Sequence, residues 1–140
     1  MSEDLSRFIK AQKYDYEQAL SEIRAGRKRS HWMWYIFPQI QGLGYSSTAQ
    51  FYAIQSLQEA KDYLAHPVLG ARLKEISSAL LEIEGRSAYE IFGYPDDLKL
   101  RSSMTLFRMA DLNCDIFEKV LEKYYDGEPD DLTVRILQQL

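Results

Sequence analysis

The sequence predicts an all-α fold: one compact domain of about seven short helices, with minor strands allowed near an aromatic run. Three observations predict it. Apolar residues recur at helical spacing in most segments, and capping residues or glycines mark the ends of those segments. No repeat, low-complexity tract or linker divides the 140 residues. A chain of this length usually folds around one hydrophobic core, so we expect a single domain over residues 1–140.

The first predicted helix ends near Gly26, which stands where a C-cap would terminate it. The helix is predicted from an apolar stripe: Leu5, Phe8, Ile9, Tyr16, Ala19, Leu20 and Ile23. The next run, residues 31–37, is apolar on every side and is closed by Pro38. Periodicity therefore does not separate a buried short helix from a buried strand in this run.

Residues 39–65 are predicted to form a loop followed by helical segments. Residues 39–48 contain two glycines and are expected to be the loop, and residues 49–54 a helical turn or two. Ser56 with Glu59 three positions later is a capping-box pattern. This pattern opens a helix that we expect to end at about Ala65.

The next two helices are predicted from their start signals. Pro67 stands at a favourable first-turn position, and the helix is expected to end at Gly85. Its apolar stripe consists of Val68, Leu69, Leu73, Ile76, Leu80 and Ile83. Ser87 and Glu90 repeat the capping-box pattern and predict a short helix after it.

The last three helices follow the same logic. Residues 95–97, Pro-Asp-Asp, are expected to start a helix that runs to Met109 or Ala110. Asn113 is the predicted cap of the next helix, which carries Ile116, Phe117, Val120 and Leu121. Residues 129–131 repeat Pro-Asp-Asp and are expected to start the final helix, residues 132–140.

Composition limits the classes of function. The net charge of −4 argues against an extended nucleic-acid surface or an anionic membrane as partner. The single cysteine, Cys114, has no internal disulfide partner, and the N-terminus lacks a signal-peptide pattern, so we expect a cytoplasmic protein. Two histidines and one cysteine give no metal-ligand pattern, and we expect no metal and no cofactor. The oligomeric state is left open.

The most unusual segment is the basic-aromatic stretch from residue 27 to residue 44. Guanidinium groups bind phosphates, and indole faces stack on nucleobases. The stretch therefore predicts a pocket for a nucleotide-like ligand, with these candidate residues: Arg27, Arg29, His31, Trp32 and Trp34. The structural alternative is a solvated helix end followed by core tryptophans.

Two further candidates lie close to predicted helix starts. Gly42 and Gly44 belong to a loop with hydroxyl residues, whose backbone amides suit an anion, although an ordinary turn explains the glycines as well. His66 directly precedes a helix start, where it is either a helix cap or a ligand-binding group.

The segment from residue 95 to residue 107 places acids, cations and hydroxyls close together. Asp97 near a helix N-terminus is explained by capping or by catalysis, and Lys99 by a surface position or by ligand binding. Ser102 on an otherwise apolar helix needs a hydrogen-bond partner, which a polar cleft or a structural contact would supply.

Most of the chain resembles a bacterial family of unknown function, the domain-of-unknown-function family eighteen-ten, whose members are often mislabelled calpastatin. The residues that carry the resemblance are Lys28 to Trp34, Phe37 to Gln39, Gly42 to Gly44, His66 to Gly70 and Lys99 to Phe107. The resemblance implies a small helical domain and brings no established activity.

Residues 48–57 and 65–73 are also similar to the NADAR (NAD- and ADP-ribose-associated) family, whose proteins process ADP-ribose derivatives and related N-glycosides. The similarity places Tyr52 among the candidate ligand-binding residues. This chain departs from the family's pattern, because the acidic position falls on Ala49 and the histidine on Gln50. Asp97 is then the leading substitute acid or base.

Three functions follow from these residues. In the first, an N-glycosidic-bond hydrolase, Arg27 and Arg29 hold phosphate and Trp32 or Trp34 stacks on the base. Asp97 stabilises the developing oxocarbenium charge or activates water, and His31 donates the proton. The second is a non-catalytic module that binds a nucleotide derivative in the same pocket. The third is a protein-interaction domain.

Overall fold

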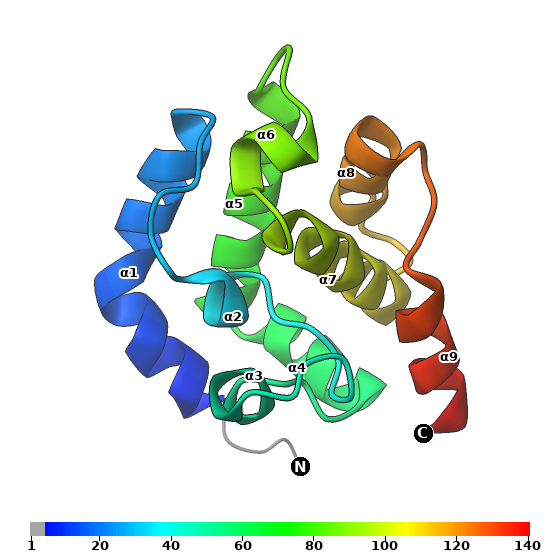
Figure 1. Ribbon diagram of the computed structural model, residues 1–140. Helices are drawn as coiled ribbons and strands as arrows, with labels where there is room; N and C mark the ends of the chain where they lie inside the picture. The colour runs from blue at the N-terminus through cyan, green and yellow to red at the C-terminus, as the bar shows by residue number, and fades with distance from the viewer. Residues whose placement is uncertain (1–4) are drawn as a thin grey trace.

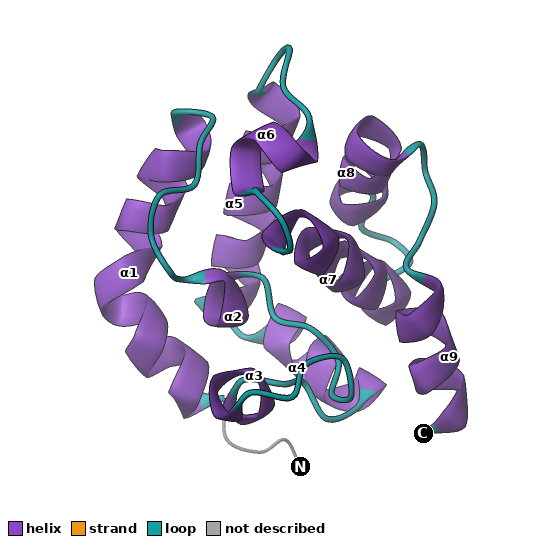
Figure 2. Ribbon diagram, viewed as in Figure 1, coloured by secondary structure: helices purple, strands orange, loops and turns teal. Residues whose placement is uncertain are grey.

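The computed structural model describes residues 5–140, which form helices and no strand (Figures 1 and 2). The nine helices of this part of the chain are α1 (Ser6–Arg24), α2 (Met33–Ile36), α3 (Ser47–Phe51), α4 (Leu57–Ala65), α5 (Leu69–Glu82), α6 (Ala88–Phe92), α7 (Asp96–Ala110), α8 (Ile116–Tyr125) and α9 (Asp131–Gln139). The predicted all-α fold is confirmed. The signal-peptide prediction rests on residues 1–5, of which residues 1–4 lie outside the described part of the chain.

Two short helices, α2 and α3, bring the number to nine. Sequence pattern left the segment of α2 undecided between helix and strand, and it predicted α3 as a helical turn or two over residues 49–54. The aromatic run forms α2, a single turn whose Met33, Tyr35 and Ile36 are buried. Helix α3 begins after Ser46, whose hydroxyl accepts a hydrogen bond from the Ala49 amide at 3.1 Å. In place of the minor strand, residues 5–140 contain an isolated parallel bridge between Ile40 and Ile54.

The predicted caps are confirmed at some helix starts and are wrong at others. Ser87 and Glu90 form a complete capping box at α6. At α4 the Ser56 hydroxyl caps the Glu59 amide, but the Glu59 carboxylate accepts from the amide of Gln55, one residue before the cap. Asn113 does not cap α8, because α8 begins after Asp115.

Helix α7 occupies the middle of the molecule, with α4 and α8 packed against it and α1 packed on α5 (Figure 1). Its inner face is fully buried at Leu100, Met104 and Phe107. The Phe107 ring contacts Tyr63 from α4 at 5.3 Å and Phe117 from α8 at 6.0 Å between centroids. Aromatic packing at the core therefore joins three helices that are distant in sequence.

Each helix within residues 5–140 is too short or too polar to cross a lipid bilayer.

Candidate functional site

A cavity of about 360 Å³ opens beside the loop that joins α2 to α3. Its walls come from α2, from this loop, from α3 and from the linker between α3 and α4. Three aromatic side chains and four carboxamides dominate the lining, which consists of Trp34, Gln39, Ile40, Gln41, Gly42, Gly44, Tyr45, Ala49, Gln50, Tyr52, Ala53 and Gln55. A cavity of this size and composition suits a small ligand with a flat ring and hydrogen-bonding edges.

Two short segments of the lining, residues 39–41 and 53–55, are held together by their backbones at an isolated parallel bridge between Ile40 and Ile54. The Gln41 amide donates to the Ile54 carbonyl at 2.8 Å, and the Ile54 amide donates to the Gln39 carbonyl at 2.9 Å. Side chains alternate in direction along extended backbone. Ile40 and Ile54 are fully buried, so their neighbours are directed toward the cavity, which Gln39, Gln41, Ala53 and Gln55 line.

Arg7 on α1 fixes the α3–α4 linker. Its Nε donates to the Phe51 carbonyl at 2.8 Å and its Nη2 to the Ala53 carbonyl at 2.9 Å. Nη2 also lies 3.6 Å from Glu59 Oε1, which accepts from the Gln55 amide at 2.8 Å. Arg7 and Glu59 therefore hold the backbone on both sides of the cavity-lining segment, although neither residue touches the cavity.

Glycine is required at each of the two loop positions, 42 and 44, for a different structural reason. Gly42 has φ +97°, a conformation that side chains rarely adopt. Gly44 lies so close to α3 that a Cβ at this position would come within 2.7 Å of the Ala49 Cβ. The Gln50 side chain then ties α3 back to the loop by donating to the Tyr45 carbonyl at 2.8 Å.

One cation, Lys99, lies against a wall of this cavity. Among the described residues, no Asp, Glu, Lys, Arg or His belongs to its lining. The Lys99 ammonium lies 5.4 Å from the ring centroid of Trp34, and 3.7 Å from the carboxylate of Asp96. Asp96 also pairs with Lys28 at 2.9 Å. Lys99, beside Trp34, therefore shares Asp96 with a second lysine, Lys28.

The structure brings four of the predicted site residues together in the cavity: Trp34, Gly42, Gly44 and Tyr52. Lys99 joins them through its contact with Trp34. The other predicted residues lie elsewhere.

Trp32 is buried, and its indole Nε1 donates to the Glu22 carboxylate at 2.8 Å. Glu22 also accepts from the Arg29 amide and from the amide and hydroxyl of Ser30. Burial by itself raises the pKa of Glu22, but these hydrogen bonds and one from Gln18 lower it to about 2. The Glu22 carboxylate therefore fixes the backbone of residues 29 and 30 and the Trp32 indole by hydrogen bonds, and Trp32 belongs to the core.

Arg27 and His31 lie away from the cavity. Arg27 is exposed and lines a separate cleft with Lys28, Arg86 and residues of α6. His31 is exposed, and its carbonyl accepts from the Tyr35 hydroxyl. The Arg29 side chain is likewise exposed, while its amide is held by Glu22.

Two predicted site residues make structural hydrogen bonds. His66 ends α4, and its Nδ1 accepts from the Val68 amide at 3.1 Å, so it has the capping role that the sequence allowed. The Ser102 hydroxyl contacts Asp130 at 3.1 Å and joins α7 to the start of α9.

Asp97 lies in the first turn of α7 and outside the cavity lining. Its backbone carbonyl accepts from the Tyr125 hydroxyl. Its Oδ1 is buried and has no hydrogen-bond partner within the described part of the chain. A buried unpaired carboxylate oxygen is uncommon in proteins and asks for an explanation.

Sequence reasoning missed Tyr45 and the four glutamines of the lining. The signal was present in composition, since Gln39, Gln41, Gln50 and Gln55 fall within 17 consecutive residues. It was not decisive, because a glutamine in a loop usually faces solvent.

Comparisons with known proteins place the chain in an uncharacterised group. A family model described as "Protein of unknown function (DUF1810)" matches residues 2–137. The chain is also similar to a solved structure, the crystal structure of the conserved hypothetical protein Rv1873 from Mycobacterium tuberculosis. The two are 52% identical over 96% of each chain, with a TM-score of 0.95. No curated protein matches the chain. Neither match supports the NADAR resemblance, which stays a prediction.

Proposed function

We propose that this chain, which belongs to the DUF1810 family of proteins of unknown function, reversibly binds a small ligand with a nucleobase-like ring. The observation that carries the proposal is the cavity lined by Trp34, Tyr45, Tyr52 and four glutamines. Aromatic side chains stack on the flat faces of such a ring. Carboxamides both donate and accept hydrogen bonds, so they match its edges without requiring a charge.

Binding fits the cavity better than catalysis does. Breaking an N-glycosidic bond needs a group that stabilises positive charge or activates water, and carboxylates usually supply it. The lining has no carboxylate among the described residues. In the NADAR resemblance, the family's acid and histidine correspond to Ala49 and Gln50, and both of these line the cavity. A ligand in the cavity would therefore be held by described residues that include no acid. The single cysteine favours a reducing compartment, so we place this function in the cytoplasm.

Removing the Tyr45 ring is expected to weaken ligand binding without unfolding the protein. Tyr45 is 84% exposed, so Tyr45→Ala costs little stability, whereas losing one stacking partner of a base weakens binding about tenfold or more. The measurement is a thermal-shift screen against nucleosides, nucleotides, NAD and ADP-ribose, followed by calorimetric titration of each ligand that gives a shift.

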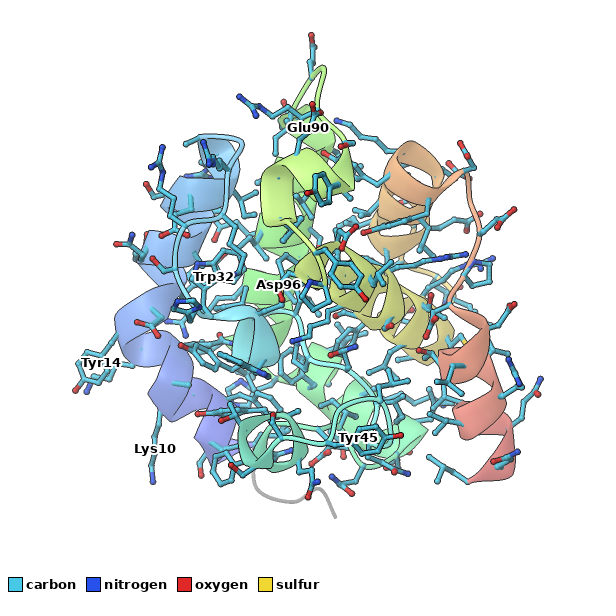
Figure 3. The ribbon with its side chains drawn as sticks, in the orientation of Figure 1. Lys10, Tyr14, Trp32, Tyr45, Glu90 and Asp96 are labelled. Carbon is cyan, nitrogen blue, oxygen red and sulfur yellow. The ribbon has the colours of Figure 1, made fainter. Side chains whose placement is uncertain are left out.

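Tyr14→Ala is the matched control. Tyr14 is 79% exposed and points outward from α1, away from the cavity (Figure 3). Equal affinities of the two variants would refute the cavity as the binding site. If no compound shifts the wild type, the protein-interaction alternative leads.

A hydrolase acting at an N-glycosidic bond is the second candidate, favoured by the unpaired Oδ1 of Asp97. It requires a ligand that reaches from the cavity to α7. In this scheme Asp97 activates the water that attacks the anomeric carbon. His31, the proton donor expected from the sequence, lies away from the cavity, so the departing base takes its proton from solvent.

Asp97→Asn is then expected to abolish base release and to preserve binding, because the amide keeps the shape but accepts no proton. The measurement is chromatography of the free base after prolonged incubation. Asp131→Asn, an acid in the first turn of α9, serves as control. If the wild type binds the ligand but releases no free base, the hydrolase hypothesis is wrong and the binding-module hypothesis remains.

A further inference from the structure

A cluster of three charges, Lys28, Asp96 and Lys99, adjoins the cavity through Lys99, whose ammonium contacts the Trp34 ring. The three charges sum to one surplus positive charge. The whole chain is negative, at −4, so this surplus is local. Figure 3 shows Asp96 near the middle of the molecule, at the start of α7. The two lysines of the cluster differ in how firmly they are held.

Lys28 is fixed in place. Its side chain is 8% exposed, its Nζ donates to the Ser30 carbonyl at 2.5 Å and pairs with Asp96 at 2.9 Å. The same ammonium lies 5.0 Å from the ring centroid of Trp32, which is buried. Breaking these contacts would leave charges buried and unpaired, which is strongly unfavourable.

Lys99 is held loosely. Its side chain is 28% exposed, and its ammonium is 3.7 Å from Asp96. A pair of this length and exposure contributes little to stability. If Lys99 leaves, Asp96 keeps its closer partner Lys28, so no charge is left uncompensated. Lys99 is thus free to exchange Asp96 for another anion at low cost.

We propose that Lys99 binds an anionic phosphate carried by the ligand whose ring occupies the cavity. This inference rests on the proposed function, and it narrows the ligand from nucleosides to nucleotides. The Lys99 ammonium lies 5.4 Å from the ring centroid of Trp34, the aromatic wall on which a base stacks. A phosphate attached to that base through its sugar would extend toward the Trp34 side of the cavity, where it meets the Lys99 ammonium. Charge-assisted hydrogen bonds to phosphate are among the stronger polar contacts in proteins.

The test compares four nucleosides with their 5′-monophosphates by calorimetric titration of the wild type, Lys99→Met and Lys99→Glu. The wild type is expected to bind the best monophosphate about tenfold more tightly than its nucleoside. Lys99→Met should remove this preference, measured as the ratio of its affinities for the monophosphate and the nucleoside, and Lys99→Glu should reverse it. The preference in the wild type should also shrink as salt is added.

Lys119→Met is the matched control, because Lys119 is likewise a helical lysine paired with an aspartate, Asp115, but on α8. It should keep the tenfold preference. The role of Lys99 would be refuted if the wild type bound nucleoside and monophosphate equally well, or if Lys99→Met kept the preference for the monophosphate. Either result would leave the proposed binding of the ring in the cavity unaffected. If no nucleoside or monophosphate binds the wild type, the proposed function fails, and this inference fails with it.

Discussion

Replacing Gly70 by alanine is expected to destabilise the protein by about 4 kcal/mol, the upper range for a single substitution. Gly70 lies in the first turn of α5, at the point where α5 crosses the end of α4. A Cβ at this position would lie 2.0 Å from the carbonyl oxygen of Leu64 and 2.8 Å from its carbonyl carbon. Both atoms belong to backbone, so no side-chain rotation relieves the overlap, and the two helices must separate.

Intrinsic propensity predicts the opposite sign, because alanine favours a helix by about 1 kcal/mol over glycine. The overlap is the larger effect. The measurement is thermal and urea unfolding, with a fall in melting temperature of about 10 °C or more expected.

Gly85→Ala is the control for this prediction. Gly85 has φ +77°, but apart from its chain neighbours no heavy atom of residues 5–140 lies within 4 Å of the place where an alanine Cβ would stand. The cost of this substitution is therefore limited to backbone strain of about 1 kcal/mol. If Gly70→Ala unfolds at the same temperature as the wild type, α4 and α5 do not pack as closely at Gly70 as the structure indicates.

Replacing Glu22 by alanine is expected to cost a similar amount, about 4 kcal/mol, for an electrostatic reason. The substitution removes the acceptor for the Arg29 and Ser30 amides and the Trp32 indole, and leaves these donors beneath the basic-aromatic stretch unpaired. Glu22→Gln should cost far less, about 1 kcal/mol, because the amide oxygen still accepts from neutral donors. Glu17→Ala, an exposed acid on the same helix, is the control and should leave stability nearly unchanged.

Glu22 also gives the protein a pH dependence with a defined direction. Its pKa falls from 4.5 to about 2 on folding, so the folded state favours the ionised form. The stabilisation is complete above about pH 4.5 and is lost as the pH falls toward 2, a change of about 3 kcal/mol. Unfolding measured between pH 6 and pH 2 should show a smaller decline for Glu22→Gln than for the wild type. Parallel declines would show that Glu22 titrates normally.

Local sequence determined the helices. Apolar spacing and capping residues act over a few neighbouring positions, and Ser87, Pro95 and Asp130 mark helix starts within a residue of where the structure has them. The wrongly predicted helix cap also has a cause in neighbouring residues. Asn113 resembles a cap, but its amide donates to the Asp111 carboxylate in a turn that delays α8.

For the candidate site, too, the sequence predicts the residue types, and the tertiary structure decides which of them come together. The sequence singles out the stretch from residue 27 to residue 44 as unusual, but its parts separate in space. Glu22, from α1, draws Trp32 into the core, while Trp34, two residues later, faces the cavity. Residue type suggested that either indole could bind the ligand. The two are distinguished by their tertiary contacts: the Trp32 indole is hydrogen-bonded to Glu22, whereas Trp34 lines the cavity.

What the sequence by itself determined is the all-α fold, the approximate helix boundaries and the presence of stacking and cationic groups. The tertiary structure decided which of these groups meet. The cavity depends on the pairing of residues 39–41 with residue 54 and on Arg7, which reaches carbonyls 44 and 46 positions away. Such contacts leave no periodic signal, because hydrophobic spacing reports which face of a helix is buried and not which distant segment covers it.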